Sequence, residues 1–128
     1  MEDGHRVAYW SAIFAAAVLE FAGDALIRRG VQKWGCLLII PGFLTLGLYG
    51  LVINLLSGPD WVTKRTGWDL SRHLGFRMDF SQLLGVYVAA FALVSVAGSY
   101  LFIDRNVPAS TWVGLAVIVA GGLIIQYG

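Results

Sequence analysis

Two acidic residues, Glu20 and Asp24, lie inside a long apolar stretch near the start of the chain, residues 7–27. A charged side chain at the centre of a membrane costs about 2.5 to 3.5 kcal/mol on insertion scales. Such residues usually mark an ion, proton or substrate path, and a carboxylate can hold a proton or a cation but not comfortably both. Glu20 is the fourteenth residue of the stretch, so it lies close to the midplane and is the strongest candidate for a binding group.

Asp24 lies one helical turn after Glu20 and shares its face, and Arg28 lies one turn further on. Asp24 either joins Glu20 in one proton and cation site or pairs with Arg28 near the membrane interface. Two tyrosines, Tyr49 and Tyr87, lie in later apolar stretches, and a buried hydroxyl usually has a hydrogen-bond partner. Either tyrosine could reach Glu20 or could only pack. The predicted proton- and substrate-binding residues are therefore Glu20, Asp24, Tyr49 and Tyr87.

The elements that position these residues are four apolar stretches, at residues 7–27, 35–56, 83–103 and 111–127. A helix of about 20 residues crosses a hydrocarbon core about 30 Å thick. Backbone in lipid must satisfy its own hydrogen bonds, so each stretch is expected to be helical. The chain of 128 residues is 58% hydrophobic and only 13% charged, whereas soluble domains carry about 25% charged residues. The sequence predicts an all-α membrane protein with a single four-helix transmembrane domain, residues 1–128.

Composition and motifs exclude several other classes of protein. The single cysteine, Cys36, cannot build a disulfide scaffold, and a net charge of +1 gives no electrostatic footprint for nucleic acid. The sequence contains no Walker loop, no paired histidine ligands and no Ser-His-Asp arrangement in a plausible setting. We therefore expect no enzyme activity, no metal site and no cofactor.

The connections between the stretches carry most of the charge. The longest, residues 57–82, interleaves basic and aromatic side chains, which suits either a segment in the headgroup layer or an irregular loop. Four spans place this segment and both termini on one side, with five basic residues there and four on the other side. Orientation follows an excess of Lys and Arg in cytoplasmic loops. So small a difference favours insertion in both orientations, which allows an antiparallel homodimer; alternatively, the basic cluster at residues 28–33 sets one orientation.

The fourth stretch is rich in small residues, which let another helix approach closely. Gly114 lies near its start, and Gly121 and Gly122 lie in its second half. Such a face is typical of any helical membrane bundle, so by itself it predicts packing and no particular function.

The stretches also resemble a known family. The run Ala-Ala-Val-Leu-Glu-Phe-Ala-Gly at residues 16–23 resembles the first helix of the small multidrug resistance family, and residues 114–126 resemble its fourth helix. Pro41-Gly42, followed by Thr-Leu-Gly-Leu-Tyr at residues 45–49, is similar to the second helix of the YnfA-type branch of this family. The run Gly-Val-Tyr-Val at residues 85–88 is similar to the third helix of that branch. The resemblance covers all four stretches, about three quarters of the chain.

This resemblance implies an antiparallel dimer of four-helix subunits that exports small cationic or aromatic compounds in exchange for protons, in a bacterial inner membrane. Glu20 matches the glutamate that the family uses for proton and cation in turn, and Tyr87 matches a tyrosine near the substrate path. The fourth-helix glycines, Gly114, Gly121 and Gly122, correspond to the dimer contact.

The chain departs from the family pattern in three places. Leu83 lies near the position of a tryptophan in the drug exporters, and Asp24 is an additional acid. The segment 57–82 is about a dozen residues longer than the resemblance implies.

Three functions remain as expectations. A proton-coupled transporter would bind a small cationic or aromatic substrate at Glu20. A lipid-linked or metabolite flippase subunit would hold a phosphate with the basic and aromatic segment 57–82, and a membrane adaptor without transport would dock a partner there. The first is favoured, because it alone explains a carboxylate at mid-membrane.

Overall fold

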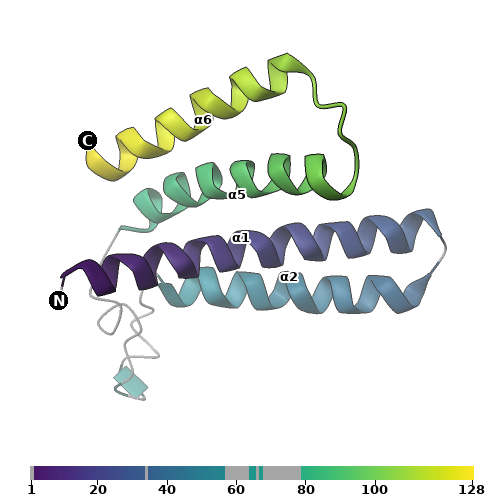
Figure 1. The fold of residues 1–128 in the computed structure, drawn as a ribbon. Coiled ribbons are helices and arrows are strands. Elements are labelled where there is room, and N and C mark those ends of the chain that lie inside the picture. The colour runs from purple at the N-terminus through teal and green to yellow at the C-terminus, as the bar shows by residue number, and fades with distance from the viewer. Residues whose placement is uncertain (1, 34, 57–63, 66, 68–78) are drawn as a thin grey trace.

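The computed structural model consists mainly of long helices (Figure 1). It describes residues 2–33, 35–56, 64–65, 67 and 79–128. Four helices form its framework: α1 (Glu2–Gln32), α2 (Cys36–Leu56), α5 (Phe80–Phe102) and α6 (Ala109–Tyr127). No strand occurs in this part of the chain. The predicted all-α fold is therefore confirmed.

All four helices contain a span long and apolar enough to cross a membrane: Arg6–Gln32, Cys36–Leu55, Phe80–Phe102 and Ala109–Tyr127. Many large apolar side chains on the outer faces are exposed, among them Leu37, Phe43 and Val117. Exposure of this kind is unfavourable in water but not in lipid, which is as apolar as leucine. The chain is thus a multi-pass membrane protein, as the hydropathy predicts.

The first helix is longer than the predicted span of residues 7–27, because it begins at Glu2 and continues to Gln32 through the basic cluster. Gly30 does not end the helix there, since it packs against α2, where an added Cβ would lie 2.6 Å from Ile39 Cγ1. Arg29 lies in the last turn, where a positive charge favours the helix dipole. The chain reverses just beyond, where the Gly35 N–H donates to the Gly30 carbonyl at 2.9 Å.

The second difference concerns the long polar connection. Helix α5 begins at Phe80, three residues before the expected start of the third span at residue 83. Most of the segment 57–82 lies outside the described residues, so its predicted place in the headgroup layer, or as an irregular loop, stays a prediction.

The helices are arranged so that α1 contacts both α2 and α5, while α6 contacts α5 (Figure 1). Both chain termini lie at the same end of the molecule. Helices α1 and α2 approach closely at two glycines, because an added Cβ on Gly23 would lie 2.8 Å from Leu46 Cγ, and one on Gly42 would lie 2.6 Å from Ile27 Cγ1. Small residues therefore set the separation of this pair.

The buried core lies where α1, α2 and α5 meet. The first helix contributes a stripe with helical spacing, the second contributes one residue, and the fifth contributes four. These residues are Tyr9, Ile13, Ala16, Ala17, Ile53, Leu83, Val86, Tyr87 and Ala90. Glu20 lies one turn beyond Ala16 on α1 and so continues this stripe.

Candidate functional site

Glu20 lies in the middle of the first span. The centre of the span Arg6–Gln32 is residue 19, so the Cα of Glu20 is about 1.5 Å along the helix axis from that centre. Its side chain is half-buried, at the edge of the core formed by α1, α2 and α5. A carboxylate at this depth requires a polar partner, because lipid and apolar side chains provide none.

That partner comes from α5. The Tyr87 hydroxyl donates a hydrogen bond to Glu20 Oε2, joining two helices across the core. Tyr87 is 3% exposed, so its ring is held by packing while its hydroxyl meets the acid. Of the two possibilities for this tyrosine, packing alone or contact with Glu20, the structure shows the contact.

Two more aromatic rings extend the site. Tyr49, from α2, stacks on Tyr87 with ring centroids 5.4 Å apart and planes inclined by 23°. Phe91, from α5, also stacks on Tyr87, with ring centroids 6.3 Å apart and planes inclined by 20°. We call Glu20, Tyr49, Tyr87 and Phe91 the carboxylate–aromatic cluster. Three helices contribute to it, so its geometry depends on how they pack.

Phe91 was not among the predicted site residues. It follows Tyr87 by four residues, the spacing that brings two side chains together on one face of a helix. That spacing could have identified it once Tyr87 was chosen.

The chemistry available to the cluster is that of a cation site. A carboxylate attracts a positive charge, and the faces of aromatic rings attract organic cations further. The same carboxylate can bind a proton instead, so the two ligands exclude each other. Over the described part of the chain, no group of three or more His, Cys, Asp or Glu side chains is placed to hold a metal ion.

Asp24 is not part of the cluster. Its side chain is exposed, one turn from Glu20, and has no hydrogen bond to either tyrosine. The alternative pairing is not formed either, since Asp24 and Arg28 make no ion pair with each other in the structure. Its predicted role in proton and substrate binding stays a prediction.

The three glycines of α6 face different surroundings. Gly122 is buried inside the subunit, where an added Cβ would lie 2.4 Å from the Cβ of Ala89 on α5. Gly114 and Gly121 have open space within 4 Å of an added Cβ. Within one chain, Gly122 therefore serves the contact between α6 and α5, while Gly114 and Gly121 are available to another helix.

The cluster brings together residues that are 67 positions apart, Glu20 and Tyr87, with Tyr49 from a third helix. Comparison with known proteins adds no relative to this picture. No protein-family model matches the chain, and neither does any curated protein or solved structure.

Proposed function

We propose that this protein is a proton-coupled secondary transporter that exports small cationic or aromatic compounds, with Glu20 as the group that binds proton and substrate in turn. In this proposal two chains form an antiparallel homodimer in a bacterial inner membrane, as in the small multidrug resistance family. Each chain contributes one carboxylate–aromatic cluster to a shared site near the midplane.

One observation carries the proposal, namely the hydrogen bond from Tyr87 to Glu20 in the middle of a membrane span. An acid at this depth is energetically unfavourable, so its presence indicates a functional role. The stacked aromatic rings beside it suit an organic cation. A structural role alone would not require the only acid at the centre of a described span to accept a hydrogen bond from a buried tyrosine of another helix.

The exchange follows from charge balance. A proton on Glu20 leaves when a cation binds, so the site carries one positive charge at a time. Because the loaded site reopens on the opposite side of the membrane, a proton moving inward exchanges with a cation moving outward. The antiparallel dimer offers two equivalent orientations for this step.

The experiment is proton release from purified protein in weakly buffered detergent solution. Guanidinium, tetramethylammonium and benzyltrimethylammonium are added in turn, because they differ in size and aromatic character. We expect the wild-type protein to release protons with at least one of them and Glu20→Gln to release none. Asp79→Asn is the matched control, since it removes an exposed acid that precedes α5 and lies outside the cluster.

Two results would contradict the proposal. One is proton release from Glu20→Gln equal to that of the wild-type protein. The other is no release from any folded variant with any of the cations, which would favour the adaptor or the flippase subunit. Folding is checked separately, by the elution volume and the helical circular dichroism of each variant.

A further inference from the structure

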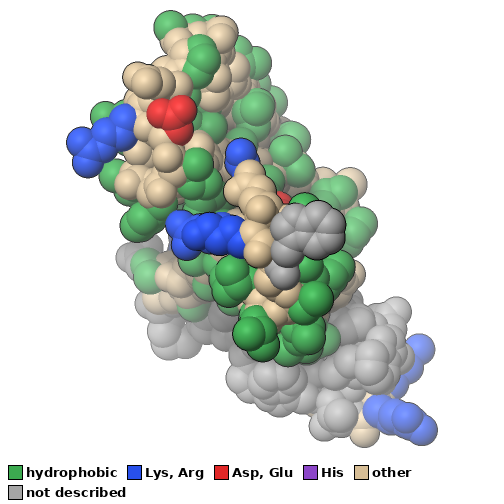
Figure 2. Space-filling view, turned by 90° about the vertical axis from the view of Figure 1, so that its right-hand side faces the viewer, with side chains coloured by type: hydrophobic (Ala, Val, Ile, Leu, Met, Phe, Trp, Pro, Cys, Tyr) green, Lys and Arg blue, Asp and Glu red, His purple; other side chains and the backbone are tan. Residues whose placement is uncertain are grey.

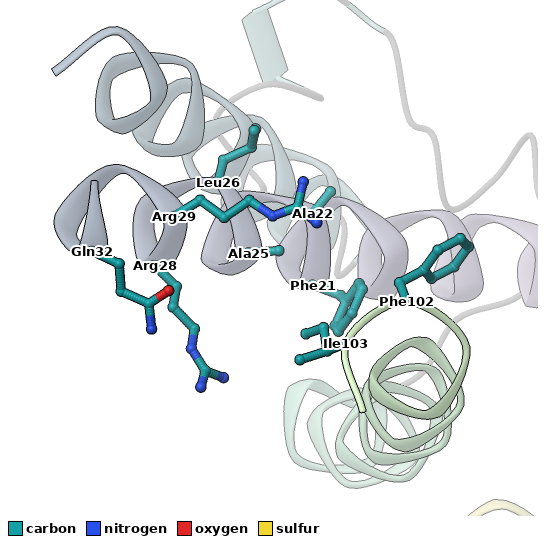
Figure 3. Close-up of a pocket in the computed structure, with 9 residues that line it drawn as sticks. All are labelled: Phe21, Ala22, Ala25, Leu26, Arg28, Arg29, Gln32, Phe102 and Ile103. Carbon is teal, nitrogen blue, oxygen red and sulfur yellow. The ribbon is translucent and has the colours of Figure 1, made fainter. Parts of the chain in front are cut away.

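A groove lies between the C-terminal half of α1 and the C-terminal end of α5 (Figure 3). It has a volume of about 570 Å³. Its polar part consists of Arg28, Arg29 and Gln32, and its apolar walls include Phe21 and Phe102. Neither Glu20 nor Asp24 lines it, so it is separate from the carboxylate–aromatic cluster.

The apolar floor of the groove is held in place by packing. Phe21 lies over Gly98 of α5, where an added Cβ would be 2.6 Å from the end of the phenylalanine ring. In Figure 3, Phe21 and Ile103 lie next to each other at the end of the groove away from the arginines. The floor thus joins α1 to α5.

The charge of the groove is positive. Arg28 and Arg29 are both exposed, and among the described residues no acidic side chain lines the groove with them. Figure 2, which looks at this end of the molecule, shows basic side chains among apolar ones. In Figure 3 the Arg28 and Arg29 side chains extend in different directions from α1, so each offers its own guanidinium group at this end of the groove. A guanidinium group binds phosphate in a bidentate manner, which favours a phosphate ligand here.

The depth of the groove in the membrane indicates where that phosphate comes from. Arg28 lies nine residues after the centre of the first span, which is about 14 Å along the helix and close to the edge of the hydrocarbon core. Phe21 lies only two residues from that centre, at the level of acyl chains. Phe102 is 74% exposed at the end of α5 and forms the side wall. A free phosphate ion would contact the arginines alone and leave the apolar walls uncovered.

We propose that this groove binds one anionic phospholipid of the surrounding membrane, with its phosphate at the end of the groove that Arg28 and Arg29 line and an acyl chain along Phe21 and Phe102. Arginine side chains reach from the helix to the headgroup layer, which places their charge at phosphate depth. The bound lipid then links α1 to α5 at the end where the structure leaves the groove open. This site does not depend on the transport proposed for Glu20.

The test measures how much dioleoylphosphatidylglycerol the protein retains, by native mass spectrometry after purification with a defined amount of that lipid. Dioleoylphosphatidylcholine serves as the zwitterionic comparison. We expect the variant with both Arg28→Gln and Arg29→Gln to bind phosphatidylglycerol about 30-fold more weakly, from the usual contribution of two basic residues near a membrane surface. Arg105→Gln is the matched control, because it removes an exposed base at the same end of the molecule that does not line the groove.

A second variant tests the apolar wall. Phe102→Ser keeps both arginines and should weaken phosphatidylglycerol retention several-fold, whereas binding of phosphate by the arginines alone would be unchanged. In a further arm, inorganic phosphate is added at about 10 mM. It is expected not to displace the lipid, because it offers no apolar contact.

Three results would overturn the proposal. The first is equal retention of phosphatidylglycerol by the double variant and by Arg105→Gln. The second is displacement by inorganic phosphate, which would make the groove a soluble-anion site. The third is a loss of dimer in the double variant without any change in lipid retention, which would assign the groove to a contact between subunits.

Discussion

The region where α1, α2 and α5 meet differs from α6 in how its helices are held. In the first region, α1 has neighbours on two sides, and Gly23 and Gly42 allow close contact with α2. Helix α6 contacts α5, and Gly122 is its one buried residue. The residues that form the hydrogen bond between Tyr87 and Glu20 are therefore held in place by several helices, whereas α6 is held by α5.

This difference shows what determines packing in a membrane. Lipid is as apolar as leucine, so burial of apolar area does not pull helices together there. Helices associate there through close van der Waals contact at small residues and through hydrogen bonds between helices. Helices α1 and α5 have a close contact at a small residue, where Phe21 lies against Gly98, and a hydrogen bond between Tyr87 and Glu20. For α6, the described contacts are at small residues such as Gly122 and at the edge-to-face pair of Tyr100 and Trp112, whose ring centroids lie 6.0 Å apart.

The largest effect is expected from Gly23→Ala. The added Cβ would lie 2.8 Å from Leu46 Cγ and 3.1 Å from the Gly42 carbonyl oxygen, so α1 and α2 must separate. We expect a loss of about 1 to 3 kcal/mol in the free energy of unfolding, as for other overpacked sites. Tryptophan fluorescence during unfolding in mixed detergent and SDS micelles measures this change.

The matched variant is Gly47→Ala on α2, where an added Cβ meets nothing within 4 Å. Alanine favours a helix over glycine by about 1 kcal/mol, so this variant should be as stable as the wild-type protein or more stable. Equal destabilisation by the two variants would show that the glycines matter for something other than the contact between α1 and α2.

A smaller effect is expected from Tyr87→Phe, which removes the hydroxyl and keeps the stacked ring. Hydrogen bonds between membrane helices contribute about 0.6 kcal/mol on average and about 1.7 kcal/mol at most. Loss of the donor leaves the Glu20 carboxylate less well oriented, so cation affinity should fall by about 3- to 20-fold. Titration of proton release with the active cation measures the affinity.

Tyr49→Phe is the comparison variant, because Tyr49 stacks on Tyr87 but has no described hydrogen bond to Glu20. Its effect should be the smaller of the two. A larger effect of Tyr49→Phe would move the cation site from the carboxylate towards α2.

The four spans could be predicted from sequence because lipid imposes a simple requirement on length and hydropathy. The end of α1 could not be predicted in this way. Residues 28–32 stay helical through contacts that the sequence does not display, such as that of Gly30 with Ile39. Glu20 was predictable from the cost of its charge at mid-span.

The partner of Glu20 was harder to predict than Glu20 itself. Two tyrosines were candidates, and the choice depends on how α2 and α5 are rotated about their axes. That rotation follows from contacts such as Gly42 against Ile27 and Gly98 against Phe21, which a hydropathy pattern does not contain. For the same reason, the sequence could not distinguish Gly122, which faces α5, from its neighbour Gly121, which does not.

A small effect on the subunit is expected from Gly122→Ala. Its added Cβ would lie 2.4 Å from the Cβ of Ala89, but α6 can move outward because α5 is its neighbour on one side only. The loss in the free energy of unfolding should therefore be about 1 kcal/mol, at the low end for overpacking.

Gly121→Ala should leave this free energy unchanged and weaken the proposed dimer, measured by energy transfer between labelled chains in vesicles. If Gly121→Ala instead destabilised the subunit as much as Gly122→Ala did, α6 would be held on two sides, and its contrast with α1 would disappear.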